Sequence, residues 1–270
     1  MTTTLAIANQ KGGVAKTTTV ASLGAALAEL GHSVLLVDLD PQACLTFSLG
    51  IDPEDLETSV HQVLTQGVDA TEVVIETEDG VDLLPATIEL ARAEADLLTR
   101  TGREHVVKGV IEDLEDTYDW VLLDCPPSLG VLTVAALTAA DGVLVPLQCE
   151  TLSHRGVGQL LDTVHDVRRF TNKRLEVWGV LPTLFDGRTN HSRTVLETIA
   201  ETYSLDVVEP PIPKTIKFAE APAAGRSILA TSRSSKGAQA YREVAVALVE
   251  RAARPRRATR KPARKPAREA

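Results

Sequence analysis

The segment "IANQKGGVAKTTT", residues 7–19, decides which fold this chain should adopt. An apolar run ends at its start, two glycines follow, and a lysine with three threonines leads into a long pattern of small and apolar residues. That order predicts a strand, a tight turn and a helix. The turn resembles a phosphate-binding loop, except that Gln10 and Ala15 stand where the standard pattern has its first and last glycine. On this segment alone, an ordinary strand-to-helix turn is the alternative.

Such a turn can hold a phosphate group for physical reasons. The first backbone N–H groups of a helix have no partner within the helix, and the helix dipole favours an anion at that end. Gly12 and Gly13 would let the backbone approach phosphate oxygens without a Cβ in the way. We then expect Lys16 to reach the β- and γ-phosphates and the Thr17 hydroxyl to bind Mg²⁺.

Strand-like and helix-like patterns alternate along most of the chain. The predicted strands cover residues 4–9, 33–40, 81–86, 118–127, 141–148 and 175–183. The predicted helices cover residues 17–31, 88–99, 104–116, 153–170, 190–203 and 235–252, with a short helix around Val60 and Leu64 and mostly loop over 207–226. This alternation predicts an α/β fold, a doubly wound and mostly parallel sheet flanked by helices, with ligands at the carboxyl ends of the strands.

Composition and charge divide the chain into a body and a tail. Of 270 residues, 44% are hydrophobic and only 3% are aromatic, so the core should be aliphatic. The net charge of -9 conceals an asymmetry, because nine Arg or Lys and one Glu occur in residues 251–270. We assign residues 1–252 to a single domain and residues 253–270, mainly Ala, Pro, Arg and Lys, to a disordered basic tail.

Cysteine usage and hydropathy favour a soluble protein of the reducing cytoplasm. Cys44, Cys125 and Cys149 occur singly, without metal-ligand or disulfide-framework spacing, and we interpret them as buried small hydrophobic residues. No charged-then-apolar leader opens the chain, and no apolar run approaches the roughly 18 residues that a bilayer-spanning helix needs. After Val249 the tail has no Leu, Ile, Phe or Trp, which argues against insertion into a membrane.

Aspartates stand at the ends of two further predicted strands. Asp38 and Asp40 close the strand that follows the first helix, and Asp124 closes the strand over 118–127. Strand-end aspartates are usually caps or turn formers. Three of them beside a lysine-containing loop instead predict a carboxylate set for a magnesium ion and its waters.

Three motifs carry a family resemblance. "KGGVAKTTT" (11–19), "VLLVDLDPQ" (34–42) and "WVLLDCPPSLG" (120–130) resemble the signatures of the ParA/MinD-type deviant Walker A ATPases, and are most similar to the Soj-like ParA partition ATPases. The likeness continues in "LPTLFDGRTN" (181–190) and "IPKTIKFAEAP" (212–222). The resemblance implies a P-loop ATPase with ATP and Mg²⁺ as its ligands.

The resemblance also implies roles for single residues. The nucleotide would be held by a loop and helix start made of Gly12, Gly13, Val14, Ala15, Lys16, Thr17 and Thr18. Lys11 is similar to the signature lysine that crosses a dimer to the partner's phosphates, and Lys16 to the lysine that acts in its own subunit. Asp40 matches the acid that positions the attacking water. Thr17, Asp38 and Asp124 would hold the metal ion and its waters.

For DNA, the resemblance points to Arg188 and Lys217, with Lys214 a short step away and Arg193 and Arg226 as further candidates for the same face. Each of these cations taken singly is more often a solvated surface charge. The basic tail adds an independent argument, because an extended polycation neutralises phosphates without reading bases. A solubility tail, or a tether for an acidic protein partner, is the alternative for that segment.

Together these features predict an ATP-dependent dimerisation switch that binds DNA non-specifically. Hydrolysis, stimulated by a ParB-like partner, would release the DNA and drive its segregation in the cytoplasm, at the nucleoid. Two alternatives stay open. One is an ATP-bound recruitment module that barely hydrolyses, which Ala15 favours because a methyl group would lie near the phosphates. The other is a ParA-like ATPase that positions a protein cargo.

Overall fold

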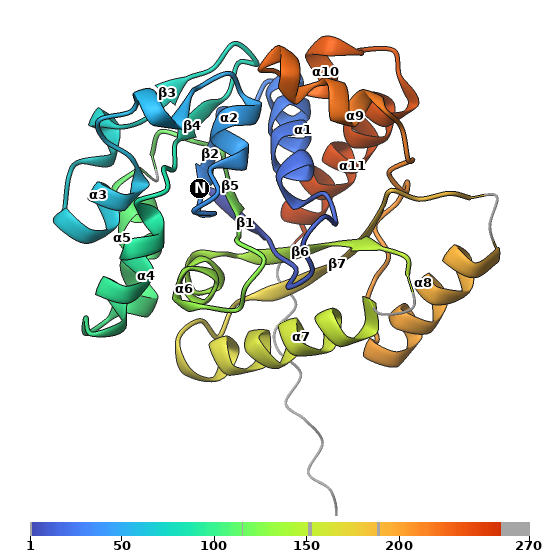
Figure 1. Cartoon of the computed structure of the whole chain (residues 1–270). Helices are drawn as coiled ribbons and strands as arrows, with labels where there is room; N and C mark the ends of the chain where they lie inside the picture. Colours follow the sequence, from blue (N-terminus) through green and yellow to red (C-terminus); the bar gives the residue numbers. More distant parts are fainter. Residues whose placement is uncertain (1, 115, 151–152, 188–189, 255–270) are drawn as a thin grey trace, which may run out of the picture.

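The computed structural model describes residues 2–114, 116–150, 153–187 and 190–254. Their centre is a seven-stranded sheet in the order β3-β4-β2-β5-β1-β6-β7 (Figure 1). The strands are β1 (Thr3–Ile7), β2 (Val34–Asp38), β3 (Ile75–Glu76), β4 (Asp82–Leu84), β5 (Trp120–Asp124), β6 (Gly142–Gln148) and β7 (Glu176–Thr183). All neighbouring pairs are parallel except β3 with β4. The predicted α/β fold is confirmed.

Helices cover both faces of this sheet (Figure 1). One face packs against α1 (Lys16–Glu29), α2 (Cys44–Ser48), α10 (Ile228–Thr231) and α11 (Lys236–Ala252). The other packs against α3 (Val60–Gln66), α4 (Leu90–Leu98), α5 (Val106–Asp113), α6 (Val131–Ala139), α7 (Ser153–Phe170) and α8 (Asn190–Tyr203). Each face has its own hydrophobic core. Along β2, Val34 and Leu36 belong to the core on the α1 face, whereas Leu35 and Val37 belong to the core on the α3–α8 face. Successive strand side chains point to opposite faces, so a strand buried on both sides is a continuous apolar run.

Every predicted strand and long helix is present, with boundaries shifted by a few residues. The prediction omitted β3, α2, α6 and α10. The stretch over 207–226, interpreted as mostly loop, contains the short helix α9 (Lys217–Glu220) and a single 3-10 turn (Pro222–Ala224). Isolated bridges pair Val180 with Val207 and Phe185 with Pro213, so this stretch runs beside β7 and the residues that follow it.

The interpretation of the cysteines was wrong at one position. Cys125 and Cys149 are buried, but Cys44 is exposed at the first residue of α2. The helix turns its Leu45 and Thr46 inward instead, so the cysteine at its start faces solvent.

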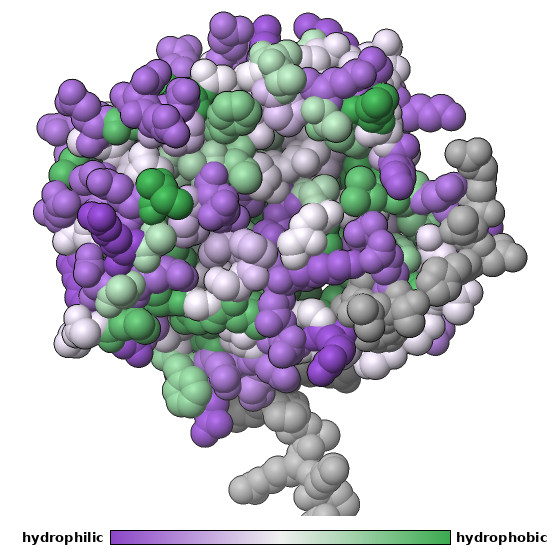
Figure 2. All heavy atoms as spheres, viewed as in Figure 1, coloured by the Kyte–Doolittle hydropathy of each residue, from purple (hydrophilic) through white to green (hydrophobic). Residues whose placement is uncertain are grey.

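The visible surface is mostly hydrophilic, and exposed apolar side chains lie in separate spots (Figure 2). Within the described residues, no helix is long and apolar enough to cross a membrane.

Candidate nucleotide site

The loop between β1 and α1 is anchored by two polar side chains. Asn9 donates a hydrogen bond from Nδ2 to the Pro146 carbonyl (2.8 Å) and accepts one at Oδ1 from the Lys11 backbone N–H (2.9 Å). Thr183, at the end of β7, donates its hydroxyl to the Val14 carbonyl (2.9 Å). Both anchors are buried, so β6 and β7 hold the loop in one conformation. Sequence reasoning missed both residues.

The backbone of this loop leaves room for a ligand. A Cβ atom built on Gly12 or Gly13 would meet nothing within 4 Å, and Gly13 has a φ of +73°. The N-cap residue of α1 gives no side-chain hydrogen bond to the first turn, and that turn contains no acidic residue. The first N–H groups of α1 are therefore available to an external anion.

Ala15 adopts a conformation that the sequence did not lead us to expect. It is the N-cap residue of α1 and lies in the left-handed region, with φ 65° and ψ 36°. The left-handed region favours glycine, because an L-residue there brings its Cβ too close to the next carbonyl oxygen.

Lys16 begins α1 and is 7% exposed, whereas Thr17 and Thr18 are half-buried. The positive charge of Lys16 lowers the pKa of Asp124, which burial raises much more strongly. Lys16 and the Asp124 carboxylate are therefore close enough to interact electrostatically. A buried lysine is suited to bind a phosphate, because a charge-assisted hydrogen bond to the anion is strong.

Asp38 and Asp124 are register partners on the adjacent strands β2 and β5, and both are fully buried. Asp38 accepts hydrogen bonds on both oxygens: the Thr46 N–H (3.0 Å) and hydroxyl (2.8 Å) bind Oδ2, and the Asp40 N–H (3.1 Å) binds Oδ1. Burial nevertheless raises the pKa of Asp38 to about 6.

Asp124 differs from Asp38 in its hydrogen bonding. Both of its carboxylate oxygens are buried and have no hydrogen-bond partner of standard geometry in the described part of the chain. Burial, and next the neighbouring charge of Asp38, raise the pKa of Asp124, while the nearby Thr17 hydroxyl and Lys16 lower it. A buried, unpartnered carboxylate is costly. A magnesium ion held between Asp124, Thr17 and a phosphate would relieve that cost, so the residues present fit the metal.

The described residues contain no group of three or more His, Cys, Asp or Glu side chains that could hold a metal ion by themselves. Any magnesium here would need phosphate oxygens and water to complete its shell, as Mg²⁺ in nucleotide sites does.

Asp40 and Lys11 are less buried than Lys16, Asp38 and Asp124. The Asp40 carboxylate is half-buried and accepts the Gln42 N–H (3.0 Å). Lys11 forms an ion pair between its Nζ and Glu150 Oε2 (2.5 Å), with both side chains partly exposed. Glu150 follows β6 and is far from Lys11 in the sequence, so no local pattern indicated the pair.

The predicted DNA-binding residues are only partly brought together. Arg188 lies outside the described residues. The Lys214 backbone N–H bonds the Phe185 carbonyl (3.3 Å), which places it beside the segment that leads to position 188, and its side chain is exposed. Lys217 begins α9 and pairs with Glu220 (2.7 Å).

The two further candidates for that face have local partners. Arg193 donates to the Gly187 carbonyl (2.9 Å). Arg226 pairs with Asp79 (3.0 Å) and contacts Glu78, so a DNA phosphate would have to compete with two acids for its guanidinium. Its place on the DNA-binding face stays a prediction.

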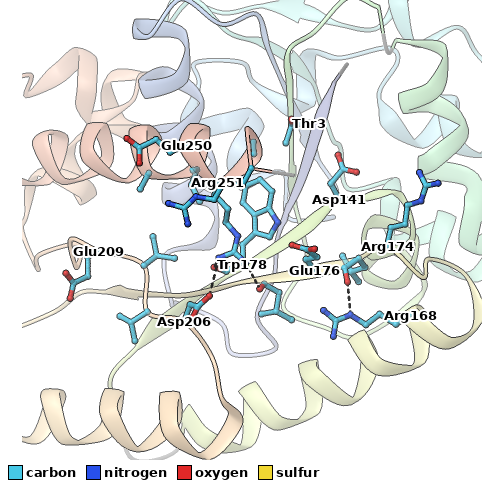
Figure 3. A pocket seen from close by; sticks show the side chains of 18 of the residues that line it. Thr3, Asp141, Arg168, Arg174, Glu176, Trp178, Asp206, Glu209, Glu250 and Arg251 are labelled. Atoms are coloured by element: carbon cyan, nitrogen blue, oxygen red, sulfur yellow. Dashed lines mark hydrogen bonds and ion pairs between the residues drawn. The ribbon is translucent and has the colours of Figure 1, made fainter. Parts of the chain in front are cut away.

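A separate hollow of about 1370 Å³ opens at the amino end of the sheet (Figure 3). Arg251 lies at its centre, where it donates to the Trp178 carbonyl (2.7 Å), pairs with Asp206 (3.4 Å) and stacks over the Trp178 ring. Arg168 donates to the Leu175 carbonyl (2.6 Å) on the other wall. These charges already have partners, and the hollow holds none of the residues that the sequence singled out for nucleotide binding.

Comparison with known proteins finds relatives over most of the chain. The model of a family described as an AAA domain matches residues 2–177. Sporulation initiation inhibitor protein Soj of Bacillus subtilis is 43% identical over 242 residues, 89% of this chain and 96% of Soj. Chromosome partitioning protein ParA of Caulobacter vibrioides is 40% identical over 250 residues, 92% of this chain and 94% of that protein. A solved structure of cobyrinic acid a,c-diamide synthase from Mycobacterium smegmatis with bound ADP and magnesium is 56% identical, with a TM-score of 0.84, and the match covers 93% of this chain and 95% of that one.

Proposed function

The chain belongs to the ParA/MinD family of deviant Walker A ATPases, and from that premise we propose that it is a partition switch driven by ATP and magnesium. In this proposal two ATP-bound copies form a dimer that binds DNA non-specifically. ATP hydrolysis, stimulated by a ParB-like protein, then releases the DNA. The protein would act in the cytoplasm, at the nucleoid.

The observation that carries the nucleotide assignment is that both buried oxygens of Asp124, beside Thr17 and Lys16, have no hydrogen-bond partner of standard geometry among the described residues. When bound, magnesium would neutralise charge on the phosphates and on Asp124. The uncapped start of α1 supplies N–H donors, and Lys16 supplies a buried positive charge. Gly12 and Gly13 keep Cβ atoms away from the loop.

Phosphoryl transfer needs positioning and charge stabilisation more than covalent chemistry. In this proposal Lys16 stabilises charge on the transferred phosphate from within the subunit, and Lys11 does so from the partner. Asp40 orients the attacking water. Its half-buried carboxylate, fixed by the Gln42 N–H, has acceptor capacity left for that task.

The ion pair between Lys11 and Glu150 bears on the dimer. A lysine that crosses to the other subunit must first leave Glu150. Exposed pairs of this kind contribute only about 0–1 kcal/mol, so ATP in the partner's site could compete for the lysine. The pair would hold Lys11 within its own subunit until then.

DNA binding is supported by the adjacency of two segments and by the tail. The bridge from Phe185 to Pro213 places Lys214 beside the chain that leads to Arg188. Lys217 pairs with an exposed glutamate on its own short helix, so a DNA phosphate could replace that partner. The cations of residues 253–270 would add sequence-independent attraction.

The relative from Mycobacterium smegmatis supports a second candidate function, an ATP-dependent synthase that forms amides on cobyrinic acid. Both candidates need the same nucleotide and metal, so the site does not separate them. ATP consumption stimulated by cobyrinic acid and an amide-nitrogen donor, but not by DNA with a ParB-like protein, would identify the synthase.

Retention on immobilised DNA tests the switch directly. We expect the full chain to be retained with Mg²⁺ and ATP, and released with ADP or without nucleotide. Arg188→Ala and Lys217→Ala should weaken retention while ATP binding persists. Lys173→Ala is a matched control, because this lysine lines the hollow at the amino end. Equal retention in all three nucleotide states would contradict the proposal.

A further inference from the structure

A buried threonine on α2 connects the ends of two neighbouring strands, β2 and β4. Thr46 is 0% exposed, and its hydroxyl lies between Asp38 on β2 and Ala86 after β4. Sequence reasoning gave it no role, because the motif around Asp38 and Asp40 ends before α2 begins.

The hydrogen bonds fix the direction of the hydroxyl proton. A backbone N–H can only donate, so the Ala86 N–H (2.9 Å) makes the Thr46 oxygen an acceptor. The Thr46 proton is therefore free to point to Asp38 Oδ2 (2.8 Å), which also receives the Thr46 N–H (3.0 Å). Two donors from one residue hold one oxygen of Asp38.

These two hydrogen bonds determine which oxygen of Asp38 can accept a further donor. A carboxylate offers about four acceptor sites. Two on Oδ2 are filled by Thr46 and one on Oδ1 by the Asp40 N–H (3.1 Å), which leaves one on Oδ1. Counting the described residues, the remaining acceptor site of Asp38 is thus on Oδ1, the oxygen that Thr46 does not touch.

We propose that Thr46 is a positioning residue for magnesium: it locks the Asp38 carboxylate so that Oδ1 presents its last acceptor site to a water molecule of the metal. This inference rests on the proposed function, since it assumes that nucleotide and magnesium bind here. Thr46 itself touches neither. It acts through Asp38, as outer residues of metal sites do when they orient the inner ones.

The test compares two substitutions that differ in the hydroxyl. Thr46→Val keeps the shape and removes the hydroxyl, so both the Ala86 N–H and Asp38 lose a partner. Thr46→Ser keeps the hydroxyl and removes a methyl group. Thr138→Val is a matched control. Thr138 is also buried, but it lies in the last turn of α6 and its hydroxyl bonds that of Thr171 instead of a residue of the nucleotide site.

The measurement is ATP binding by calorimetry on the full chain at increasing Mg²⁺. We expect Thr46→Val to need at least about 10-fold more Mg²⁺ for half-maximal enhancement of binding, as outer-shell substitutions do. ATP affinity without magnesium should change less than about twofold, and Thr46→Ser and Thr138→Val should follow the wild type.

Three outcomes would overturn the inference: an unchanged magnesium requirement in Thr46→Val, an equal loss in Thr46→Ser, or an equal loss in Thr138→Val. If the valine variant does not fold, Thr46→Ala replaces it in the same titration, and the serine result still decides whether the hydroxyl is the group that matters. A wild type that binds no ATP with magnesium would instead refute the proposed function.

Discussion

Charged side chains are buried at the carboxyl end of the sheet, whereas at its amino end they are partly exposed and paired. At the carboxyl end Lys16, Asp38 and Asp124 are buried, and Asp124 has no hydrogen-bond partner of standard geometry among the described residues. At the amino end Arg251 and Asp206 pair with each other along an open hollow of about 1370 Å³ (Figure 3). The hollow therefore lies away from the residues proposed to bind the nucleotide. The proposed function therefore rests on unsatisfied buried charge and not on the volume of a hollow.

Lys16→Ala should give the largest effect at the carboxyl end. It removes the buried charge that would face the phosphates, so we expect ATP affinity to fall by at least about 100-fold. Calorimetry with magnesium measures this. The fold should persist by circular dichroism, and ATP binding close to that of the wild type would remove the basis for placing nucleotide at this end.

Asp124→Asn should separate stability from function. The pKa of Asp124 is raised, so the folded state binds more protons than the unfolded state, and the stability of the ligand-free chain falls as pH rises. The amide has no charge to bury, so we expect Tm at neutral pH to rise by about 2 °C or more and its pH dependence to weaken.

Magnesium-dependent ATP hydrolysis should be lost in the same variant, since the amide cannot neutralise a cation. Asp82→Asn, at the amino end of β4, is a control that leaves hydrolysis unchanged. A lower Tm together with normal hydrolysis would mean that Asp124 is structural.

Ala15→Gly should remove backbone strain beside the proposed nucleotide site, at the carboxyl end of the sheet. An L-residue in the left-handed region costs about 1 kcal/mol or slightly more, so we expect Tm to rise by about 2–4 °C. Ala43→Gly relieves the same conformation at the start of α2 and is the matched control. If only Ala15→Gly also raises the hydrolysis rate, the methyl group of Ala15 slows turnover; a fall in Tm would contradict the strain.

Arg251→Gln should have the smallest effect on nucleotide binding. Its partners are carbonyl groups, an exposed aspartate and the Trp178 ring, so the substitution costs some stability at the amino end. ATP affinity should stay within about twofold of the wild type by calorimetry. A larger change would show that the two ends are coupled and would break the contrast between them.

The sequence was sufficient for those parts of the fold and site that depend on local order. The apolar strands ending at Asp38 and Asp124, and the glycines before Lys16, are continuous patterns, and the structure has strands and a helix there. Short elements could not be predicted, because the two residues of β3 and the five of α2 are too few to show a period.

Contacts between distant residues were also beyond the sequence. Glu150 meets Lys11 only after β6 returns beside β1, and Thr46 meets Ala86 only because β2 and β4 are neighbours. The left-handed conformation of Ala15 was missed for a different reason. Alanine carries no signal for that region of backbone space, whereas glycine at the same position would have indicated it.

The exposed ion pair of Lys11 with Glu150 gives the proposed dimer an unusual response to ionic strength. A two-fold symmetric dimer must break this ion pair in both subunits. The free energy of the pair therefore counts twice in the free energy of association. Added salt weakens exposed pairs and would lower that barrier, whereas it also displaces polycations from DNA. Self-association and DNA retention would then respond in opposite directions to added salt, so dimerisation can be measured at high salt, where DNA binding is weakest.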